Sequence, residues 1–212
     1  MKHTRWVAVA VVCLVLAGCT REVDAPRPKR EPPVAPITAA QAVDLLSKDA
    51  QQGDDGNLFA TVEPDECSGV AREVDAPFIF DPKPAAHEGG HWETDEVSVE
   101  EIVGVYRVDF DPRAALDQAK RTIESCGDDS LTVTTIEGDV DVYRMLPQVG
   151  SGSPDVLVWS FKTDGWACDN AFVAAHNAAV EITACAEANG YDVRALAQDA
   201  LKRIETLANM TV

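Results

Sequence analysis

The cysteines constrain this chain more than any other residue type, and they fall into two groups. Cys13 and Cys19 lie close to the N-terminus of the 212-residue chain. The other four lie farther along: Cys67, Cys126, Cys168 and Cys185. Disulfides form in exported proteins and are rare in cytosolic ones, so the N-terminal segment decides how these four residues are interpreted.

The N-terminus has the three parts of an export signal. Lys2 and Arg5 give a positive start, and residues 6–16 are an uninterrupted apolar run that is too short to span a bilayer. The run ends in Leu-Ala-Gly-Cys at residues 16–19, which resembles a bacterial lipobox. That resemblance implies cleavage before Cys19, so that residues 1–18 are a lipoprotein signal peptide and Cys19 receives acyl chains such as palmitate. The alternative is an ordinary signal peptide cut near Gly18.

The segment after Cys19 is rich in proline and lacks an apolar cluster. Residues 19–36 hold five of the 12 prolines: Pro26, Pro28, Pro32, Pro33 and Pro36. Such a segment favours an extended, polyproline-like conformation. We therefore expect a lipidated tether over residues 19–36, which holds a domain of residues 37–212 at the extracytoplasmic face of the cell membrane.

The charge of the chain excludes some classes of partner. Asp and Glu number 36 against 18 Lys and Arg, which gives a net charge of −18. Nucleic-acid binding needs a basic surface, so it is excluded. Docking of the domain onto anionic lipid through a basic patch is disfavoured for the same reason, and the lipid anchor is the expected membrane contact.

Hydrophobic periodicity predicts an α+β fold with an antiparallel β-sheet flanked by helices. Helices are expected at 38–50, 111–126 and from residue 192 onward. Strands are expected at 102–110, 131–137, 140–146, 156–161, 166–176 and 178–185. Gly138 is expected to lie at a hairpin turn, and residues 81–95 are expected to form a loop.

The even number of cysteines in an exported domain predicts two disulfides. Three pairings are possible, and the spacing fits Cys67 with Cys126 and Cys168 with Cys185. The domain has no Cys-x-x-Cys motif, so neither a thioredoxin-like redox site nor a zinc ribbon is suggested.

Several of these segments together resemble the PknH-like extracellular domain family. They are Pro64-x-x-Cys67, the helix that runs from Asp109 to Cys126, Trp166-x-Cys168 and the segment 177–185 that ends in Ala-Cys. The family includes the sensor domain of a mycobacterial receptor kinase and many actinobacterial lipoproteins. The resemblance implies an antiparallel sheet flanked by helices, the same two disulfides and a cleft for an extracytoplasmic ligand.

Two residues in the resembling segment are candidates for that ligand cleft. Trp166 could offer an aromatic surface, and Asn177 could offer hydrogen bonds. The alternative is that Trp166 belongs to the core and that Asn177 forms a turn between two strands.

One motif could make the protein an enzyme. His87-Glu88-Gly89-Gly90-His91 matches H-E-x-x-H, which on a helix places two zinc ligands and a general base together. Adjacent glycines destabilise a helix by about 1 kcal/mol each, and no convincing third ligand is present. We therefore expect no catalytic residues, no metal centre and no cofactor, and leave open a weak binding of Zn²⁺ or Cu²⁺ by His87 and His91.

The sequence thus predicts a non-enzymatic cell-envelope lipoprotein that displays a sensor-like ligand-binding domain. Its partner would be an extracytoplasmic small molecule, glycan, lipid or protein. A protein-interaction or scaffolding lipoprotein without a small-molecule pocket is the first alternative, and an H-E-x-x-H zinc hydrolase is the second.

Overall fold

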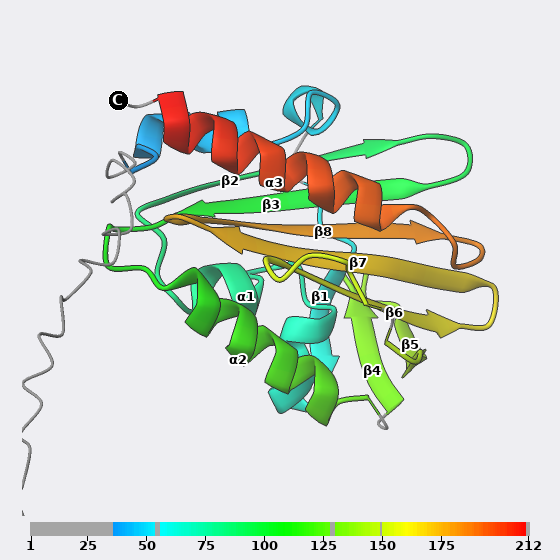
Figure 1. The fold of residues 1–212 in the computed structure, drawn as a ribbon. Coiled ribbons are helices and arrows are strands. Elements are labelled where there is room, and N and C mark those ends of the chain that lie inside the picture. Colours follow the sequence, from blue (N-terminus) through cyan, green and yellow to red (C-terminus); the bar gives the residue numbers. More distant parts are fainter. Residues whose placement is uncertain (1–35, 54–55, 128–129, 149, 211–212) are drawn as a thin grey trace, which may run out of the picture. The chain divides into compact units, whose positions relative to one another are not determined.

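An eight-stranded antiparallel sheet organises the domain (Figure 1). The computed structural model describes residues 36–53, 56–127, 130–148 and 150–210. The strands are β1 (Phe59–Glu63), β2 (Ala86–Glu93), β3 (Ser98–Val105), β4 (Ser130–Thr135), β5 (Val140–Met145), β6 (Val156–Thr163), β7 (Trp166–Ala175) and β8 (Ala178–Ala186). Their order in the sheet is β1-β4-β5-β6-β7-β8-β3-β2, so the longest strands lie in the middle and β1 and β2 are the edges.

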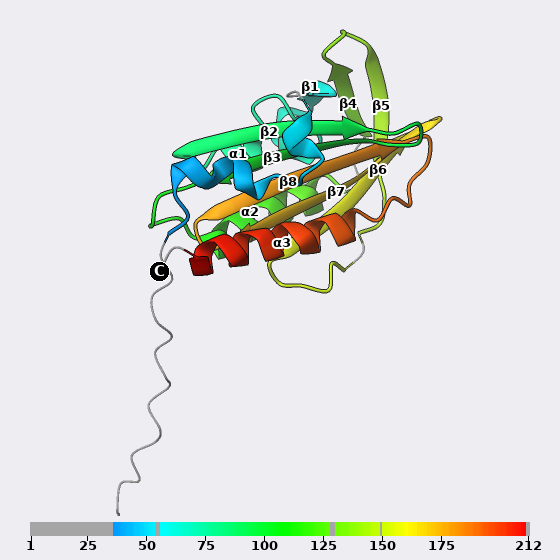
Figure 2. The same ribbon diagram turned by 90° about the horizontal axis from the view of Figure 1, so that it is seen from above.

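Helices cover both faces of this sheet. They are α1 (Pro77–Phe80), α2 (Pro112–Ser125) and α3 (Val193–Met210), with the 3-10 helices η1 (Ala39–Leu45), η2 (Ala50–Gln52) and η3 (Asp65–Val70). One core holds apolar residues of α1, α2 and η3, and the other holds those of α3 and η1. Figure 2 shows that the β4–β5 hairpin projects away from the helix-covered part of the sheet.

The central strands supply both cores because their side chains alternate between the faces. Trp159, Cys168 and Phe172 belong to the core under α2, and Val173 and Ile182 belong to the core under α3. Many of the residues between β7, β8 and α3 are alanines, including Ala171, Ala184, Ala197 and Ala200. Small side chains let a helix approach a sheet closely, and tertiary packing thereby places alanine-rich segments in strands despite the helical preference of alanine.

A buried ion pair fixes α3 and the N-terminal segment to the sheet. Glu101 of β3 is 1 % exposed, and its Oε2 accepts hydrogen bonds from Arg203 Nη2 at 3.0 Å and from the Ser47 backbone N–H at 2.8 Å. Arg203 Nε also donates to the Leu45 carbonyl at 2.7 Å. The neighbouring Glu100 faces the opposite core, so two adjacent glutamates have different environments.

Most predicted elements are confirmed. The α+β class, the helix after Asp111, the C-terminal helix, the hairpin at Gly138 and the strand pair β7–β8 are all present. Asp111 caps α2 by accepting hydrogen bonds from the backbone N–H groups of Arg113 and Ala114. Gly138 has φ +93°, a conformation that glycine adopts readily.

Three predictions of local structure need correction. The strand predicted at 102–110 is β3 at 98–105, because the chain leaves the sheet at Tyr106, whose hydroxyl donates to the Ile79 carbonyl. The helix predicted at 38–50 is divided into η1 and η2, because the Ser47 N–H donates to Glu101.

The third correction concerns residues 81–95, which contain the edge strand β2 rather than a continuous loop. The glycine pair suits a strand here because a Cβ atom at Gly90 would lie 2.2 Å from the Ala50 carbonyl oxygen. The backbone of η2 therefore packs directly against β2. The sequence contains the glycines but not this neighbour, which comes from a segment far away in the chain.

Candidate ligand-binding cavity

A row of buried polar side chains crosses the sheet on the face that α2 covers. Glu100 of β3 lies opposite Thr183 of β8, and Thr183 lies opposite Asn170 of β7. Glu181, two residues before Thr183 in β8, faces the same way. All four are buried, with exposed fractions of 5 % or less. Polar groups in a core cost free energy unless they are hydrogen-bonded, so this row is an unusual feature of the sheet.

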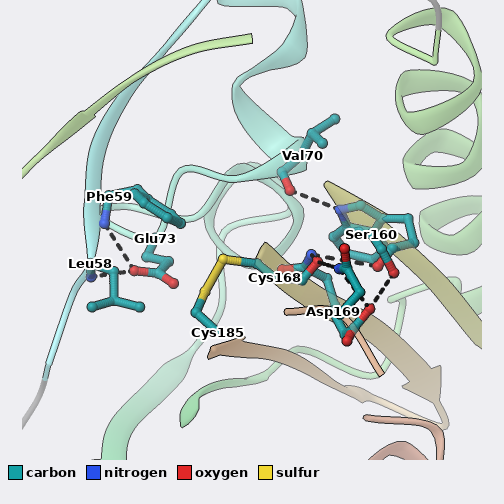
Figure 3. The surroundings of a disulfide bond; sticks show 11 residues. Leu58, Phe59, Val70, Glu73, Ser160, Cys168, Asp169 and Cys185 are labelled. Carbon is teal, nitrogen blue, oxygen red and sulfur yellow. Dashed lines mark hydrogen bonds between the residues drawn. A yellow bond between two sulfur atoms is a disulfide. The ribbon is translucent and has the colours of Figure 1, made fainter. Parts of the chain in front are cut away.

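Glu73 completes the row from the segment that passes over it. Its Oε2 accepts hydrogen bonds from the backbone N–H groups of Leu58 and Phe59, the latter at 3.0 Å (Figure 3). Its side chain is buried, and the side chains of Glu100 and Thr183 lie within hydrogen-bonding reach of its carboxyl group. Glu181 Oε2 and Asn170 Oδ1 are also buried, and neither has a hydrogen-bond partner among the residues that the structure describes. The site thus contains polar oxygens that are shielded from bulk water and incompletely satisfied.

Burial changes the acidity of these groups. Loss of solvation raises the pKa of Glu73 to about 7, although nearby Glu100, the N–H groups of Leu58 and Phe59, and Thr183 favour its charged form. Burial, together with the nearby charge of Glu73, raises the pKa of Glu181 well above its usual range. The cluster therefore exchanges protons near neutral pH, where ordinary glutamates are fully ionised.

A cavity of about 260 Å³ opens onto this cluster, and we call it the acidic cavity. Its lining residues are Asn57, Glu73, Val74, Asp75, Phe80, His87, Glu88, Gly89, Glu100 and Ile102. Glu73 and Glu100 are its buried carboxyl groups, whereas Asp75 and Glu88 are exposed. The aromatic ring of Phe80 contacts the imidazole of His87 edge to face, with ring centroids 5.0 Å apart. The cavity thus combines buried carboxyls with an aromatic ring and short apolar walls.

The strand conformation of β2 separates the two histidines of the H-E-x-x-H motif. Four residues of strand span about 13 Å, so His87 and His91 lie on the same side of β2 but far apart along it. A zinc ion needs each ligand nitrogen within about 2.1 Å, which this spacing does not allow for both imidazoles. Only His87 lines the acidic cavity, and the side chain of His91 packs near Gly56. Within residues 36–210 as described, no three His, Cys, Asp or Glu side chains are arranged to hold a metal ion.

Asn177 and Trp166 do not line one cleft. Trp166 begins β7 and Asn177 follows its other end, which places them about 30 Å apart along the strand. Asn177 Oδ1 accepts from the Ile37 N–H at 2.9 Å, and Nδ2 donates to the carbonyls of Ile37 and Tyr106. Asn177 is thus a turn residue that fixes the start of the domain, and Trp166 is a half-buried residue at the edge of the core.

Both predicted disulfides are present, and one borders the polar row. Cys168 and Cys185 are directly opposite each other on β7 and β8, two residues from Asn170 and Thr183. Cys67 of η3 is bonded to Cys126 at the end of α2, which connects the segment that precedes Glu73 to this helix.

Sequence reasoning missed the site residues Glu73, Glu100 and Glu181. A signal was present, because Glu100-Glu101 and Glu181 interrupt strongly apolar strand segments. Glu73 gives no such signal, since it lies in an irregular segment whose position over the sheet depends on tertiary contacts.

The predicted signal peptide, Cys19 and the tether lie outside the described residues. Over the part of the chain that is described, no helix combines the length and the apolar character needed to cross a membrane.

Comparisons with known proteins agree with the resemblance seen in the sequence. Residues 32–203 match the PknH-like extracellular domain family. The structure is similar to the crystal structure of the extracellular domain of PknH from Mycobacterium tuberculosis, with a TM-score of 0.62. The two share 18 % sequence identity, and the match covers 82 % of this chain and 98 % of that one. No match was found among curated proteins.

Proposed function

Because this chain belongs to the PknH-like extracellular domain family, we propose that it is an extracytoplasmic lipoprotein that binds a small ligand in the acidic cavity without chemically changing it. The family's description as an extracellular domain supports a location outside the cytoplasm. The lipobox-like segment that ends at Cys19 supports a lipid anchor in the cell membrane.

One observation carries the proposal, namely the buried carboxyl groups beside a cavity. Glu73 and Glu100 are each 4 % exposed, and both line the acidic cavity. Burying carboxyl groups costs free energy, and burial raises the pKa of Glu73 to about 7. A ligand that binds to these groups explains why this arrangement is present in an otherwise well-packed domain.

A binding experiment tests the proposed function. Full-length protein is purified from bacterial membranes in detergent and titrated with the small-molecule fraction of a cell envelope, and amide chemical shifts are recorded by NMR. We expect shifts at Glu73, Gly89 and Glu100. We expect them to disappear in the Gly89→Leu variant, whose side chain would fill the cavity. If the cavity residues do not shift, or if Gly89→Leu leaves the shifts unchanged, the proposed function is wrong.

The anchor is tested in the same preparation. Cys19→Ala removes the only residue that the lipobox-like segment offers for acylation, so we expect the protein to leave the membrane fraction. A Cys13→Ala variant is the matched control and is expected to stay membrane-bound, because Cys13 lies inside the segment that is cleaved. Retention of the Cys19→Ala protein in detergent partitioning would contradict a lipid anchor.

A second candidate function rests on the β4–β5 hairpin. Ile136, Val140 and Val142 are each more than half exposed there, although the rest of the apolar side chains are mostly buried. An exposed apolar surface is typical of protein-interaction sites, so a scaffolding role remains the alternative. Amide shifts confined to this hairpin in the presence of an envelope protein would favour it over the cavity.

A further inference from the structure

The acidic cavity selects strongly for the charge of its ligand. Four of its lining residues are acidic, namely Glu73, Asp75, Glu88 and Glu100, and no Lys or Arg lines it. Glu88 lies opposite Val103, so its side chain points to the other face of the sheet, and the carboxyls of Glu73, Asp75 and Glu100 remain beside the cavity. An anionic ligand would be repelled by these carboxyl groups, of which Asp75 also pairs with Arg72 at 3.7 Å.

The lining of the acidic cavity fits an organic cation better than a metal ion. Ca²⁺ takes six to eight oxygen ligands, whereas the buried part of the cavity offers mainly the carboxyls of Glu73 and Glu100. Val74, Phe80 and Ile102 supply apolar surface beside them. An alkyl chain can pack against this surface while its charged end meets the carboxylates, and an aromatic ring such as Phe80 also attracts an ammonium group.

The size of the cavity limits the ligand to a small molecule. Its volume of about 260 Å³ corresponds to roughly eight or nine water molecules at about 30 Å³ each. A chain of four or five methylenes that carries one or two charged nitrogens fits this space, whereas a folded peptide does not.

Resting on the proposed function, we propose that the ligand of the acidic cavity is a small organic cation, a compound with a primary amine or guanidinium group on a short alkyl chain. Its N–H groups donate to the carboxyl groups of Glu73 and Glu100, and its methylenes pack against Ile102 and Phe80. The ligand thus supplies a positive charge, which no Lys or Arg among the lining residues provides.

Binding is coupled to the protonation of the cluster. Ionisable side chains approach Glu73 from several elements: Arg72 and Asp75 from its own segment, His87 and Glu88 from β2, Glu100 from β3, Tyr143 from β5 and Glu181 from β8. Burial raises the pKa of Glu73 to about 7, so a cation that favours its charged form displaces a proton at neutral pH. Affinity therefore increases with pH between about 5.5 and 8.

The test uses full-length protein in detergent and four probes of similar size. Putrescine and agmatine are the cations, 1,4-butanediol is the neutral analogue and succinate is the anionic analogue. We expect the two cations to shift the amides of Glu73, Gly89 and Glu100 in NMR spectra, and we expect the two analogues to leave them unchanged. Calorimetry in buffers of different ionisation enthalpy is expected to detect proton release at pH 7, and roughly thirtyfold weaker binding at pH 5.5 than at pH 8.

Variants test whether cation binding depends on the carboxyl groups of the cavity or only on the overall negative charge of the domain. Glu73→Gln and Glu100→Gln are each expected to weaken cation binding roughly tenfold or more, because each removes a charge-assisted hydrogen bond. Glu93→Gln is the matched control, since Glu93 is an exposed carboxylate on β2 that does not line the cavity. Gly89→Leu blocks the cavity while both carboxyls remain, so the inference stays testable if a glutamine variant fails to fold.

The possible outcomes distinguish this inference from the proposed function. Equal binding of butanediol or succinate, or loss of cation binding in Glu93→Gln, overturns the organic-cation inference. Tighter binding of Ca²⁺ than of putrescine at the same residues overturns it as well. In these cases the proposed function stands if the envelope fraction still shifts the cavity residues. If neither the probes nor that fraction shifts them, both proposals fail.

Discussion

At the scale of single residues, Glu73 illustrates how position rather than residue type sets chemistry. The chain has 36 acidic residues, most of which are solvated, but Glu73 is buried beside Glu100 and accepts backbone hydrogen bonds from Leu58 and Phe59. Burial raises the pKa of Glu73 to about 7, and it also raises the pKa of Glu181 well above its usual range. The folded protein therefore holds protons that the unfolded chain releases.

This difference makes stability depend on pH in a predictable direction. Between pH 5 and pH 7 the folded state binds more protons than the unfolded state, so stability decreases as pH rises through this window. Glu73→Gln removes one of the groups that bind a proton in the folded state and release it in the unfolded state. The free energy of unfolding of the variant, relative to the natural protein, is expected to rise by on the order of 2–3 kcal/mol from pH 5 to pH 8. Urea denaturation at both pH values measures this difference. An exposed control, Glu63→Gln, is expected to show no such trend, and a parallel pH dependence in Glu73→Gln would contradict the assignment.

At the scale of elements, the turn between β7 and β8 ties the first residues of the domain to the sheet. Ala175 lies opposite Ala178, so His176 and Asn177 form a two-residue turn, and His176 has φ +52°. The Asn177 amide makes paired hydrogen bonds to the N–H and carbonyl of Ile37, as a neighbouring strand would. Because η1 begins two residues later, this side chain sets where the 3-10 helix packs on β3.

Loss of this amide is expected to loosen the N-terminal element more than the sheet. Asn177→Ala leaves buried backbone groups of Ile37 and Tyr106 without partners, which costs about 3 kcal/mol. Hydrogen exchange is expected to accelerate at Ile37 and through η1 while the amides in the centre of β7 and β8 remain protected. Asn177→Asp keeps the acceptor for the Ile37 N–H but places a carboxylate oxygen against the carbonyl oxygens of Ile37 and Tyr106, so it is expected to accelerate exchange at least as much as Asn177→Ala. Uniform acceleration across the whole sheet would contradict this local role.

At the scale of the whole molecule, the disulfides join elements on the face of the sheet that carries the polar row. Cys67–Cys126 joins η3 to α2 across 59 residues, and Cys168–Cys185 joins two central strands across 17 residues. The first restrains the segment that carries Glu73 over the sheet, and the second borders the polar row on the sheet itself. A cross-link stabilises mainly by restricting the unfolded chain, and the longer loop has the larger effect in the chain-entropy model.

Removing each disulfide as a pair of serines is expected to give unequal losses. Cys67→Ser with Cys126→Ser should cost about 4 kcal/mol, and Cys168→Ser with Cys185→Ser about 3 kcal/mol. Urea denaturation of the two double variants measures both, with the reduced natural protein as a reference. The opposite order would show that native packing around the β7–β8 pair outweighs loop entropy.

Local sequence determined much of this fold, because many of its signals act over a few residues. The cap at Asp111, the glycine turn at Gly138 and the apolar alternation of residues 156–161 specify α2, the β4–β5 turn and β6. The cysteine count required cross-links, and the spacing together with the family resemblance gave their pairing.

Only the tertiary structure decided the rest, because distant neighbours override local preference. Gly89-Gly90 is an edge strand since the backbone of η2 packs against it, and the H-E-x-x-H motif therefore does not bring its histidines together. Glu73 and Glu100 become one site because an irregular segment passes over β3. The raised pKa of Glu73 and the cavity beside it depend on burial and proximity, and these are properties of contacts between distant segments that no local pattern contains.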